Sequence, residues 1–252
     1  MDNREAIERV GEWLQQSRRA VVFTGAGIST ESGIPDFRSP GGLWTQNRPI
    51  DFNDFVASEA MRVEAWKRRF AMDTVLGAAK PNQGHHAIAT WTQRGHVSWV
   101  ITQNIDELHQ AAGVDRERVI ELHGSTMYAT CLDCGKRHEL AALRPRFEAT
   151  QTAPRCEACG GLVKTATVSF GQSMPVAEMR RAQTATEACD VFLAIGSSLV
   201  VYPAAGFPLH AKRIGKRLVI INREPTELDA HADIVLHSEI GPTLSELIER
   251  IS

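Results

Sequence analysis

The chain has 252 residues, of which 43% are hydrophobic and 23% are charged. This length is enough for one sizeable core, or for a core with a smaller appended module. A formal net charge of -2 excludes the long-range attraction to nucleic-acid phosphates or anionic lipids that a strongly basic chain would have. We therefore expect a globular cytoplasmic protein, a monomer that binds neither nucleic acid directly nor a membrane.

The first residues predict an amphipathic helix rather than a signal peptide. The stretch "MDNREAIERVGEWL" carries acids among its bases, and its apolar residues recur at helical spacing. These residues are Ala6, Ile7, Val10, Trp13 and Leu14. No apolar run elsewhere approaches the length of a membrane span.

Short apolar runs rich in β-branched residues recur along the rest of the chain, with helical stretches between them. They cover residues 20–24, 97–102, 118–122, 167–170, 191–196, 217–222 and 233–237. Runs that are apolar on both faces and separated by helices indicate a mostly parallel sheet that is covered on both sides. We therefore predict the α/β class, with a Rossmann-like parallel sheet and helices on both of its faces.

Two segments fall outside this alternation of strand and helix. Residues 33–90 contain no strong strand, although the stretch 51–72 looks helical, and residues 125–165 are polar, rich in turn residues and contain cysteines. The predicted division is therefore a sheet domain of residues 1–32, 91–124 and 166–252, a loop with a helical module at 33–90, and a cysteine-containing module at 125–165.

The strand at 20–24 runs into Gly25-Ala26-Gly27, the opening of a dinucleotide-binding turn. Thr30 takes the place of the third glycine of G-x-G-x-x-G, and the acidic residue expected about 20 residues further on is Asp51, where no strand is evident. The pattern fits a pyrophosphate site and an ordinary tight turn equally well. It argues against a Rossmann dehydrogenase.

Polar residues follow several of the predicted strands at the point where each strand ends. They are Gln103, Asn104 and Asp106, then His123, then Ser197 and Ser198, then Asn222 and Arg223. Ligands of open parallel sheets bind at the carboxyl ends of the strands, so we expect these side chains to meet in one crevice.

The cysteines form two C-x-x-C pairs, Cys131 with Cys134 and Cys156 with Cys159, with 21 residues between the pairs. A glycine directly follows each pair, which is typical of a tetrahedral four-cysteine zinc ribbon. Disulfides are the alternative, but a cytosolic chain keeps its thiols reduced and adjacent knuckles bridge poorly. Because four thiolates leave no position for water, we expect one structural Zn²⁺; Cys189 is expected to be a core thiol.

The motifs together resemble the sirtuins, the NAD-dependent protein lysine deacylases, in order and across nearly the whole chain. They are "GAGIS-ESGIPDFR", "GLW", "PNQGHHAI", "TQNIDELHQAAG", "ELHG", the paired C-x-x-C knuckles, "VSFGQ", "GSSLVVYPAAGFP" and "INREPT". The resemblance implies that the sheet domain binds NAD, that residues 33–90 hold a cofactor loop and a helical module, and that this module and the zinc ribbon form a small lobe. NAD and an acyl-lysine peptide would share the cleft between the two.

The resemblance also implies which residues contact NAD. It places Ala26 and the flanking glycine amides at the pyrophosphate, Arg38 at a phosphate, Phe37 over the ribose, and Ile105 with Asp106 at the nicotinamide carboxamide. The full implied set is Gly25, Ala26, Gly27, Ser29, Asp36, Phe37, Arg38, Trp44, Gln103, Asn104, Ile105, Asp106, His123, Gly196, Ser197, Ser198, Asn222, Arg223, Glu224 and Ile240.

His123 is the expected general base, with Asn104 beside it at the ribose. A histidine between a strand end and a glycine is more often structural, but the pKa range of imidazole suits removal of a hydroxyl proton near neutral pH, and "ELHG" matches the sirtuin motif. The implied reaction is attack of the acyl oxygen on the ribose, loss of nicotinamide, and transfer of the acyl group to ADP-ribose.

The resemblance implies that the peptide binds as an added strand between two segments of the chain. The contacting residues would be Val168, Ser169, Phe170, Gly171, Leu199 and Val200. The chain departs from the common sirtuin pattern at Thr165, where a proline is usual, and at Gln172, where a glutamate is usual, so the peptide preference stays open.

The expected reaction is deacetylation. Desuccinylase-type sirtuins carry a Tyr-x-x-Arg pair in the helical module, whereas the nearest stretch of this chain offers Trp66 and Arg69 without a tyrosine. Four alternatives stay open: mono-ADP-ribosylation at the same NAD site, removal of longer or acidic acyl groups, a zinc-ribbon binding module without catalysis, and the disfavoured dehydrogenase.

Overall fold

The computed structural model describes residues 2–36, 42 and 48–251, and its largest feature is a six-stranded sheet. All neighbouring strands are parallel, in the order β3-β2-β1-β7-β8-β9. The strands are β1 (Ala20–Thr24), β2 (Val97–Thr102), β3 (Val119–Glu121), β7 (Val191–Ile195), β8 (Arg217–Ile221) and β9 (Ile234–Leu236). This is the doubly wound order of Rossmann-like sheets, so the predicted fold class is confirmed.

One predicted strand was placed in the wrong sheet. Residues 167–170 do not join the parallel sheet, because β6 (Val163–Thr167) ends there after pairing antiparallel with β4 (Gly124–Cys131). The residues that follow β6 are apolar for another reason. The amide of Val168 donates to the carbonyl of His123 at 2.9 Å, and Phe170 is 44% exposed, so this segment borders an opening rather than a core.

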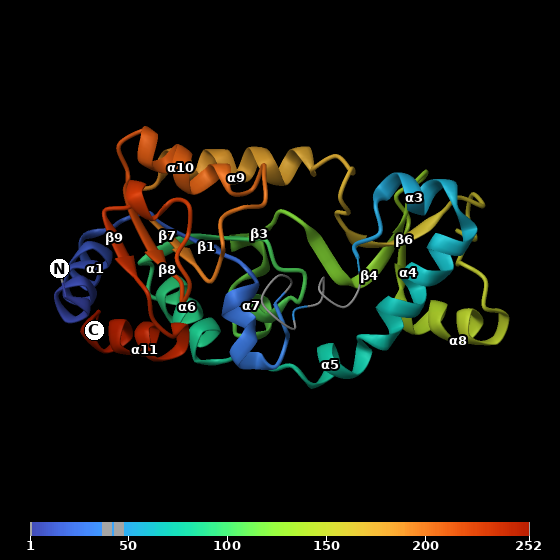
Figure 1. The fold of residues 1–252 in the computed structure, drawn as a ribbon, viewed down its shortest axis with the longest axis horizontal. Helices are drawn as coiled ribbons and strands as arrows, with labels where there is room; N and C mark the ends of the chain where they lie inside the picture. The colour runs from blue at the N-terminus through green and yellow to red at the C-terminus, as the bar shows by residue number, and fades with distance from the viewer. Residues whose placement is uncertain (1, 37–41, 43–47, 252) are drawn as a thin grey trace.

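Helices cover both faces of the large sheet (Figure 1). On one face lie α1 (Asn3–Gln16), which includes the predicted N-terminal helix, α6 (Gln83–Gln93) and α11 (Ile240–Arg250); on the other lie α9 (Val176–Ala188) and α10 (Gly206–Arg213). Asp2 and Asn82 begin α1 and α6 as capping boxes, accepting hydrogen bonds from amides of the first turn. The termini lie side by side because α1 packs on α11.

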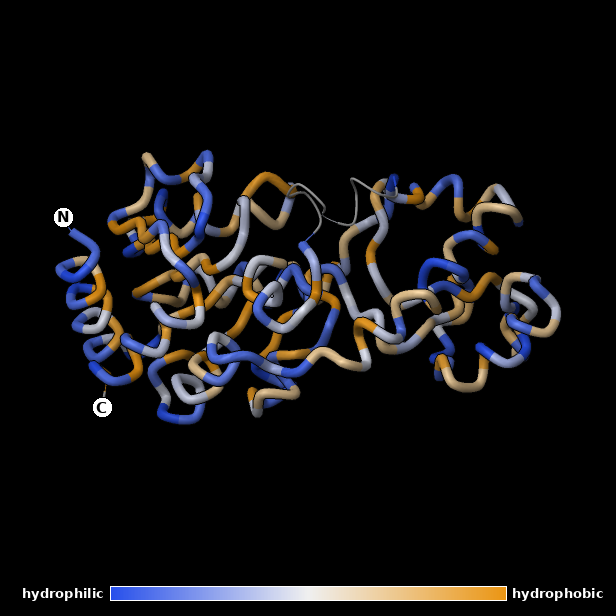
Figure 2. Tube along the Cα trace, turned by 60° about the horizontal axis from the view of Figure 1, so that its bottom comes forward, coloured by the Kyte–Doolittle hydropathy of each residue, from blue (hydrophilic) through white to orange (hydrophobic). Residues whose placement is uncertain are grey.

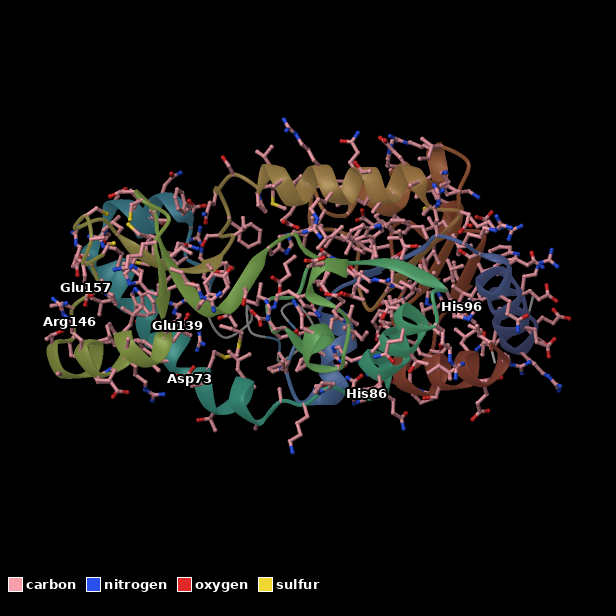
Figure 3. The ribbon with its side chains drawn as sticks, turned by 180° about the vertical axis from the view of Figure 1, so that it is seen from behind. Asp73, His86, His96, Glu139, Arg146 and Glu157 are labelled. Carbon is pink, nitrogen blue, oxygen red and sulfur yellow. The ribbon has the colours of Figure 1, made fainter. Side chains whose placement is uncertain are left out.

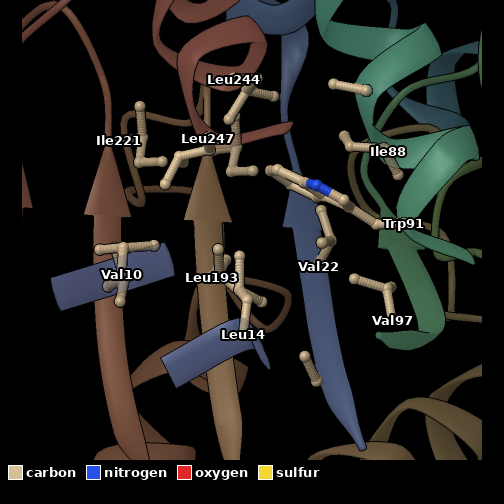
Figure 4. Close-up of a cluster of buried hydrophobic side chains, with 14 of the residues drawn as sticks. Val10, Leu14, Val22, Ile88, Trp91, Val97, Leu193, Ile221, Leu244 and Leu247 are labelled. Atoms are coloured by element: carbon tan, nitrogen blue, oxygen red, sulfur yellow. The ribbon is translucent and has the colours of Figure 1, made fainter. Parts of the chain in front are cut away.

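The core under α1, α6 and α11 is made of aliphatic side chains around one indole (Figure 4). Trp91 from α6 lies against the sheet beside Val22 of β1, while Leu244 and Leu247 of α11 lie over the strands. In Figure 2 the hydrophobic segments run through the inside of this larger lobe. The burial of both sheet faces explains why the strands read as continuous apolar runs.

A smaller lobe lies at the other end of the molecule (Figure 1). Its three-stranded antiparallel sheet has the order β5-β4-β6, with β5 at Arg137–Glu139. Its helices are α3 (Phe52–Ala57), α4 (Glu59–Ala71), α5 (Asp73–Ala78) and α8 (Leu140–Thr150). The remaining short elements are η1 (Ala26–Ser32), α7 (Leu108–Ala111), η2 (Arg116–Arg118) and η3 (Asp229–His231).

The helical module and the cysteine-containing module share one core. Trp66, 1% exposed, packs with Phe70, Phe147 and Val163, and its indole N–H donates to the carbonyl of Val163 at 3.2 Å. Asp73 carries an ion pair to Arg144 of α8 on the outside of this lobe (Figure 3). Two segments far apart in sequence therefore fold as one unit, while the exact boundaries of the predicted modules stay a prediction.

No helix within residues 2–36, 42 and 48–251 is both long enough and apolar enough to cross a membrane.

We predict that Leu193→Ala lowers the free energy of unfolding by about 2–5 kcal/mol, because the side chain is fully buried on central strand β7 and its removal leaves a cavity. Ile214→Ala is the matched control, since Ile214 is 41% exposed and its loss should cost less than about 0.5 kcal/mol. Urea denaturation checks both values. Equal losses in the two variants would contradict the assignment of β7 to the core.

Candidate functional site

The site begins where the turn after β1 touches the end of β7. The amide of Gly27 donates to the carbonyl of Gly196 at 2.8 Å, and the amide of Gly25 donates to the carbonyl of Ile195 at 3.2 Å. A Cβ atom on Gly25 or Gly27 would lie 2.7 or 2.8 Å from the Gly196 oxygen, and one on Gly196, whose φ is +64°, would lie 2.5 Å from the Ile28 nitrogen. Only glycine fits these three positions without movement of the backbone.

The same contact explains the missing third glycine of the dinucleotide motif. Gly27 is already part of η1, and within this helix the Thr30 hydroxyl donates to the Gly27 carbonyl at 2.9 Å. Thr30 therefore closes the turn from within, and the close approach that needs glycine is made at Gly196 instead.

A cavity of about 440 Å³ opens at this corner, at the carboxyl ends of the strands. It lies where the strand order reverses between β1 and β7, the position at which open α/β sheets bind ligands. Most of the residues expected from the sequence line it: Gly25, Ala26, Gly27, Asp36, Gln103, Asn104, Ile105, His123, Val168, Ser169, Phe170, Gly171, Gly196, Ser197, Ser198, Asn222, Arg223, Glu224 and Ile240. The cavity thus joins segments from both lobes.

Four expected residues of the described chain are not in the lining of this cavity. Leu199, only 1% exposed, belongs to the core under α9 and α10, and Val200 follows it on the surface. Ser29 donates to Asp106 and accepts from the side chain of Asn104, which lines the cavity. Three further expected residues, Phe37, Arg38 and Trp44, lie outside the described residues.

Other lining residues were not expected from the sequence. They are Thr30, Glu31, Pro49, Ile50, Thr167, Gln172, Met174, Val201, Tyr202, Pro203, Ser238 and Glu239. Glu31, Gln172, Val201, Tyr202 and Pro203 lie inside the recognised motifs, and that position was the available signal. Besides lining the cavity, Glu31 contacts the start of α11: its carboxylate accepts a hydrogen bond at 2.9 Å from the Gly241 amide in the first turn of that helix.

A chain of polar side chains supports the cavity wall after β2. The side-chain amide of Asn104 donates to the Ser29 hydroxyl at 3.2 Å, and that hydroxyl donates to the Asp106 carboxylate at 2.7 Å. The other carboxylate oxygen of Asp106 accepts from the Leu108 amide at 3.0 Å. Burial raises the pKa of Asp106, although these two hydrogen bonds oppose the shift.

His123 borders the cavity two residues after β3, and one of its ring nitrogens is hydrogen-bonded to the backbone. Its Nδ1 lies 2.9 Å from the carbonyl oxygen of Gln103. Because a carbonyl oxygen can only accept, Nδ1 carries the proton of the neutral ring, and Nε2 keeps the lone pair of a base. Burial lowers the pKa of His123 below its ordinary value, which keeps the ring neutral near pH 7.

The segment after β6 forms a tight turn at the edge of the cavity. The Ser169 amide donates to the Gln172 side-chain oxygen at 3.1 Å, and the Gln172 amide donates to the Ser169 carbonyl at 3.0 Å. The Phe52 amide of α3 donates to the Phe170 carbonyl at 2.8 Å. Gln172 therefore holds the turn through a neutral side chain, and the helical module is attached to the same segment.

The four cysteines converge at the far end of the smaller lobe. Cys131, Cys134, Cys156 and Cys159 have sulfur atoms that all lie within 4.8 Å of one another, and the closest pairs are 3.4 and 3.7 Å apart. These distances exclude S–S bonds and are close to the roughly 3.8 Å edge of a tetrahedron with Zn–S bonds of about 2.3 Å. The glycines after the pairs, Gly135 and Gly160, have φ of +71° and +75°.

The two C-x-x-C turns are closed by the same kind of backbone hydrogen bond. The amide of Gly135 donates to the Cys131 carbonyl at 3.0 Å, and the amide of Gly160 donates to the Cys156 carbonyl at 2.8 Å. Each left-handed glycine thus turns the chain so that both sulfurs of its pair face one point. The donor set fits a structural Zn²⁺ with four thiolate ligands.

The comparison with protein families matches residues 25–203 to the Sir2 family. The chain belongs to the Sir2 family. It is 57% identical over 247 residues to NAD-dependent protein deacetylase 1 of Bradyrhizobium diazoefficiens, and the match covers 98% of this chain and 97% of the relative. The predicted family is therefore confirmed.

Solved Sir2 structures share the fold over nearly the whole length of this Sir2-family chain. A complex of Sir2 with a p53 peptide and NAD+ matches with a TM-score of 0.85 and 36% identity, covering 96% of this chain and 97% of that one. Sir2Tm bound to a propionylated peptide matches with a TM-score of 0.86 and 34% identity, covering 98% of this chain and 99% of that one. Both lobes are therefore shared with these structures.

We predict that Cys156→Ser releases zinc from the Sir2-family chain and lowers its melting temperature, because the free energy of metal binding is part of the folding free energy of a small ribbon. Cys189→Ser is the matched control. Its buried thiol donates to the Thr186 carbonyl at 3.1 Å, far from the cluster, and a serine hydroxyl can make the same bond. Metal analysis and thermal melting check both variants. Stoichiometric zinc and unchanged melting in Cys156→Ser would refute the zinc site.

Proposed function

We propose that this chain is an NAD-dependent protein lysine deacylase, and mainly a deacetylase, which transfers the acyl group to ADP-ribose and releases nicotinamide. The observation that carries the proposal is that the glycine turn after β1, His123 and the turn at 168–172 open into one cavity. The relative from Bradyrhizobium diazoefficiens, named as an NAD-dependent protein deacetylase, is 57% identical over nearly the same length.

The turn at Gly25 and Gly27, where it meets Gly196, is proposed to bind the pyrophosphate of NAD. Gly25, Ala26 and Gly27 line the cavity, and the two glycines let this turn lie against Gly196 at the carboxyl ends of the strands, where sheets of this kind bind a pyrophosphate. Ser197 is fixed beside this corner by a hydrogen bond of 2.8 Å from the Gln103 side chain. Asn222 and Arg223, after β8, would contact the adenosine end.

The nicotinamide end is proposed to lie against residues 104–106, after β2. Asn104 and Ile105 line the cavity, while Asp106 stands behind them in the hydrogen-bond chain with Ser29. NAD supplies a ribose carbon with nicotinamide as its leaving group. The protein supplies the fixed wall that holds this end bent away from the rest of the cofactor.

His123 is proposed to take a proton from a ribose hydroxyl. Its Nδ1–H donates to the Gln103 carbonyl, so the ring is oriented with Nε2 as the basic atom. The same carbonyl stabilises the positive charge that the ring acquires when Nε2 accepts the proton. Asn104 is held by Ser29 at the same wall and would orient the ribose.

The peptide is proposed to lie between the turn at 168–172 and the loop at 197–203. Both segments line the cavity, and the exposed Phe170 and Tyr202 stand at its mouth. A strand added here would form backbone hydrogen bonds, which tolerate many peptide sequences. The cytoplasmic location, the monomeric state and the absence of a nucleic-acid partner stay predictions.

The position of Trp66 and Arg69 favours neutral acyl groups. Trp66 is inside the core of the smaller lobe, and Arg69 donates to the Thr126 carbonyl at 2.9 Å and forms an ion pair with Asp73. Neither side chain is in the lining of the cavity, so this arginine is not available to neutralise an acidic acyl group. Sir2Tm bound to a propionylated peptide supports a pocket that accepts slightly longer neutral chains.

We predict that peptides carrying acetyl-lysine or propionyl-lysine are deacylated in the presence of NAD at least about 10-fold faster than the same peptide carrying succinyl-lysine, since one uncompensated buried charge costs more than one hydrogen bond. Mass spectrometry of the peptides checks the rates. Faster removal of succinyl groups would overturn the acyl preference, and ADP-ribose found on a protein target without deacylation would favour the transferase alternative.

We predict that His123→Ala lowers the rate of deacetylation by about 10²- to 10⁴-fold, the usual contribution of a general base, while exchange of labelled nicotinamide into NAD falls much less. Exchange needs displacement of nicotinamide and its reversal, but no base. If both rates fall equally, His123 acts in NAD binding or in the first step.

The pH profile gives an independent check on His123. Because burial lowers its pKa, the neutral basic form persists below the ordinary histidine value of 6.5, and it is lost when the pH falls through the lowered pKa. The acid limb of deacetylation should therefore lie below pH 6.5 and should be missing from the residual activity of His123→Ala. An acid limb above pH 6.5 would contradict this assignment.

A further inference from the structure

The backbone turns sharply at Glu107, directly after the proposed nicotinamide wall. Glu107 has φ of 57° and ψ of 19°, in the left-handed region, and it is the N-cap residue of α7. In the described part of the chain, Glu107, Gln151 and Leu199 are the non-glycine residues with positive φ. A side chain at such a position is strained, so the presence of glutamate here calls for a compensating contact.

The Glu107 carboxylate makes that contact with both oxygens. One oxygen accepts from the Ser125 hydroxyl at 2.7 Å, and the other accepts from the Arg116 guanidinium at 2.8 Å. The Glu107 side chain is 18% exposed, whereas that of Arg116 is 63% exposed. Burial alone would raise the pKa of Glu107, but the two hydrogen bonds outweigh it and the pKa is lowered. The carboxylate is therefore charged at neutral pH.

Three hydrogen bonds tie the wall after β2 to His123 and to β4, the strand that follows it. The His123 ring bonds the Gln103 carbonyl, the Thr126 amide donates to the Ile105 carbonyl at 2.9 Å, and Ser125 donates to Glu107. In the first two the wall contributes a backbone carbonyl, which any residue provides. In the third it contributes the side chain of Glu107, so this link depends on the amino-acid sequence.

We propose that Glu107 is a positioning residue for the nicotinamide end of NAD, because its carboxylate, held by buried Ser125, fixes Ile105 and Asp106 relative to His123. This inference rests on the proposed function, which places nicotinamide at Ile105 and Asp106. Glu107 itself is not in the lining of the cavity and would act through its two neighbours. Ser125 is fully buried at the start of β4, so it is a rigid anchor.

Backbone and side-chain roles of Glu107 can be separated by substitution. Glycine adopts a φ of 57° without strain but lacks the carboxylate, whereas glutamine keeps an oxygen that can accept from Ser125. Gln151→Gly is the matched control, because Gln151 has φ of 52° at the C-terminal end of α8, in the smaller lobe. It relieves the same backbone strain without touching the proposed site.

The test measures the dissociation constant of NAD by titration calorimetry on the full chain, together with kcat and the KM for NAD in deacetylation. We expect Glu107→Gly and Ser125→Ala to raise the dissociation constant and KM by about 10-fold, because both remove the hydrogen bond between Ser125 and the charged Glu107. Glu107→Gln should stay within about 3-fold of the wild type, and Gln151→Gly should match it. The melting temperature should not fall in Gln151→Gly, since glycine adopts this φ without strain.

Unchanged NAD affinity and KM in Glu107→Gly would overturn the inference. A loss of activity in Glu107→Gly with unchanged NAD binding would overturn it too, because the effect would then be on another step. Combined with Ser125→Ala, Glu107→Gly should add less than a further 3-fold, since both variants remove the hydrogen bond between Ser125 and Glu107. If the wild-type chain binds NAD but does not deacetylate, the proposed function fails while the calorimetric comparison still decides the role of Glu107.

Discussion

The whole site depends on one contact between two pieces of backbone. The turn after β1 lies against the end of β7 with no side chain between them, because Gly25, Gly27 and Gly196 occupy the three positions where a Cβ atom would collide. This contact joins the two central strands at the point where the strand order reverses. The residues of this contact, Gly25, Gly27 and Gly196, all line the cavity.

The smaller lobe supplies further segments that border the cavity. Its first strand, β4, starts at Gly124, directly after His123, so the proposed base sits at the junction between the two sheets. The Val168 amide, just after β6, donates to the carbonyl of the same histidine. The strands that enter and leave the smaller lobe thus meet at His123. We infer that the zinc cluster at the far end contributes by keeping this lobe folded.

Much of the fold and the site could be predicted from the sequence because both faces of the parallel sheet are buried. That burial makes each strand a continuous apolar run, and six of the seven predicted runs are strands of the large sheet. Residues 167–170 were misplaced because an apolar segment at the mouth of a cavity has the same composition as a core strand. The paired cysteines could be located because their spacing reflects the geometry of the ligands.

Other features depend on geometry that spacing does not carry. Leu199 is buried in the core and has a positive φ, although it lies in a segment that the sequence assigned to the peptide site. The left-handed turn at Glu107 was not predicted, because glutamate rarely adopts a positive φ. Trp66 and Arg69 have the spacing of an acyl-binding pair, yet they pack inside the smaller lobe. The places of these side chains could not be predicted from the sequence, because contacts between distant segments determine them.

The most direct test of the account is the stoichiometry of products from an acetyl-lysine peptide and NAD. Nicotinamide, the deacetylated peptide and O-acetyl-ADP-ribose should form in equal amounts, because one bond to nicotinamide is broken for each acetyl group transferred. Free acetate without consumption of NAD, reduced nicotinamide cofactor, or ADP-ribose without deacetylated peptide would contradict it.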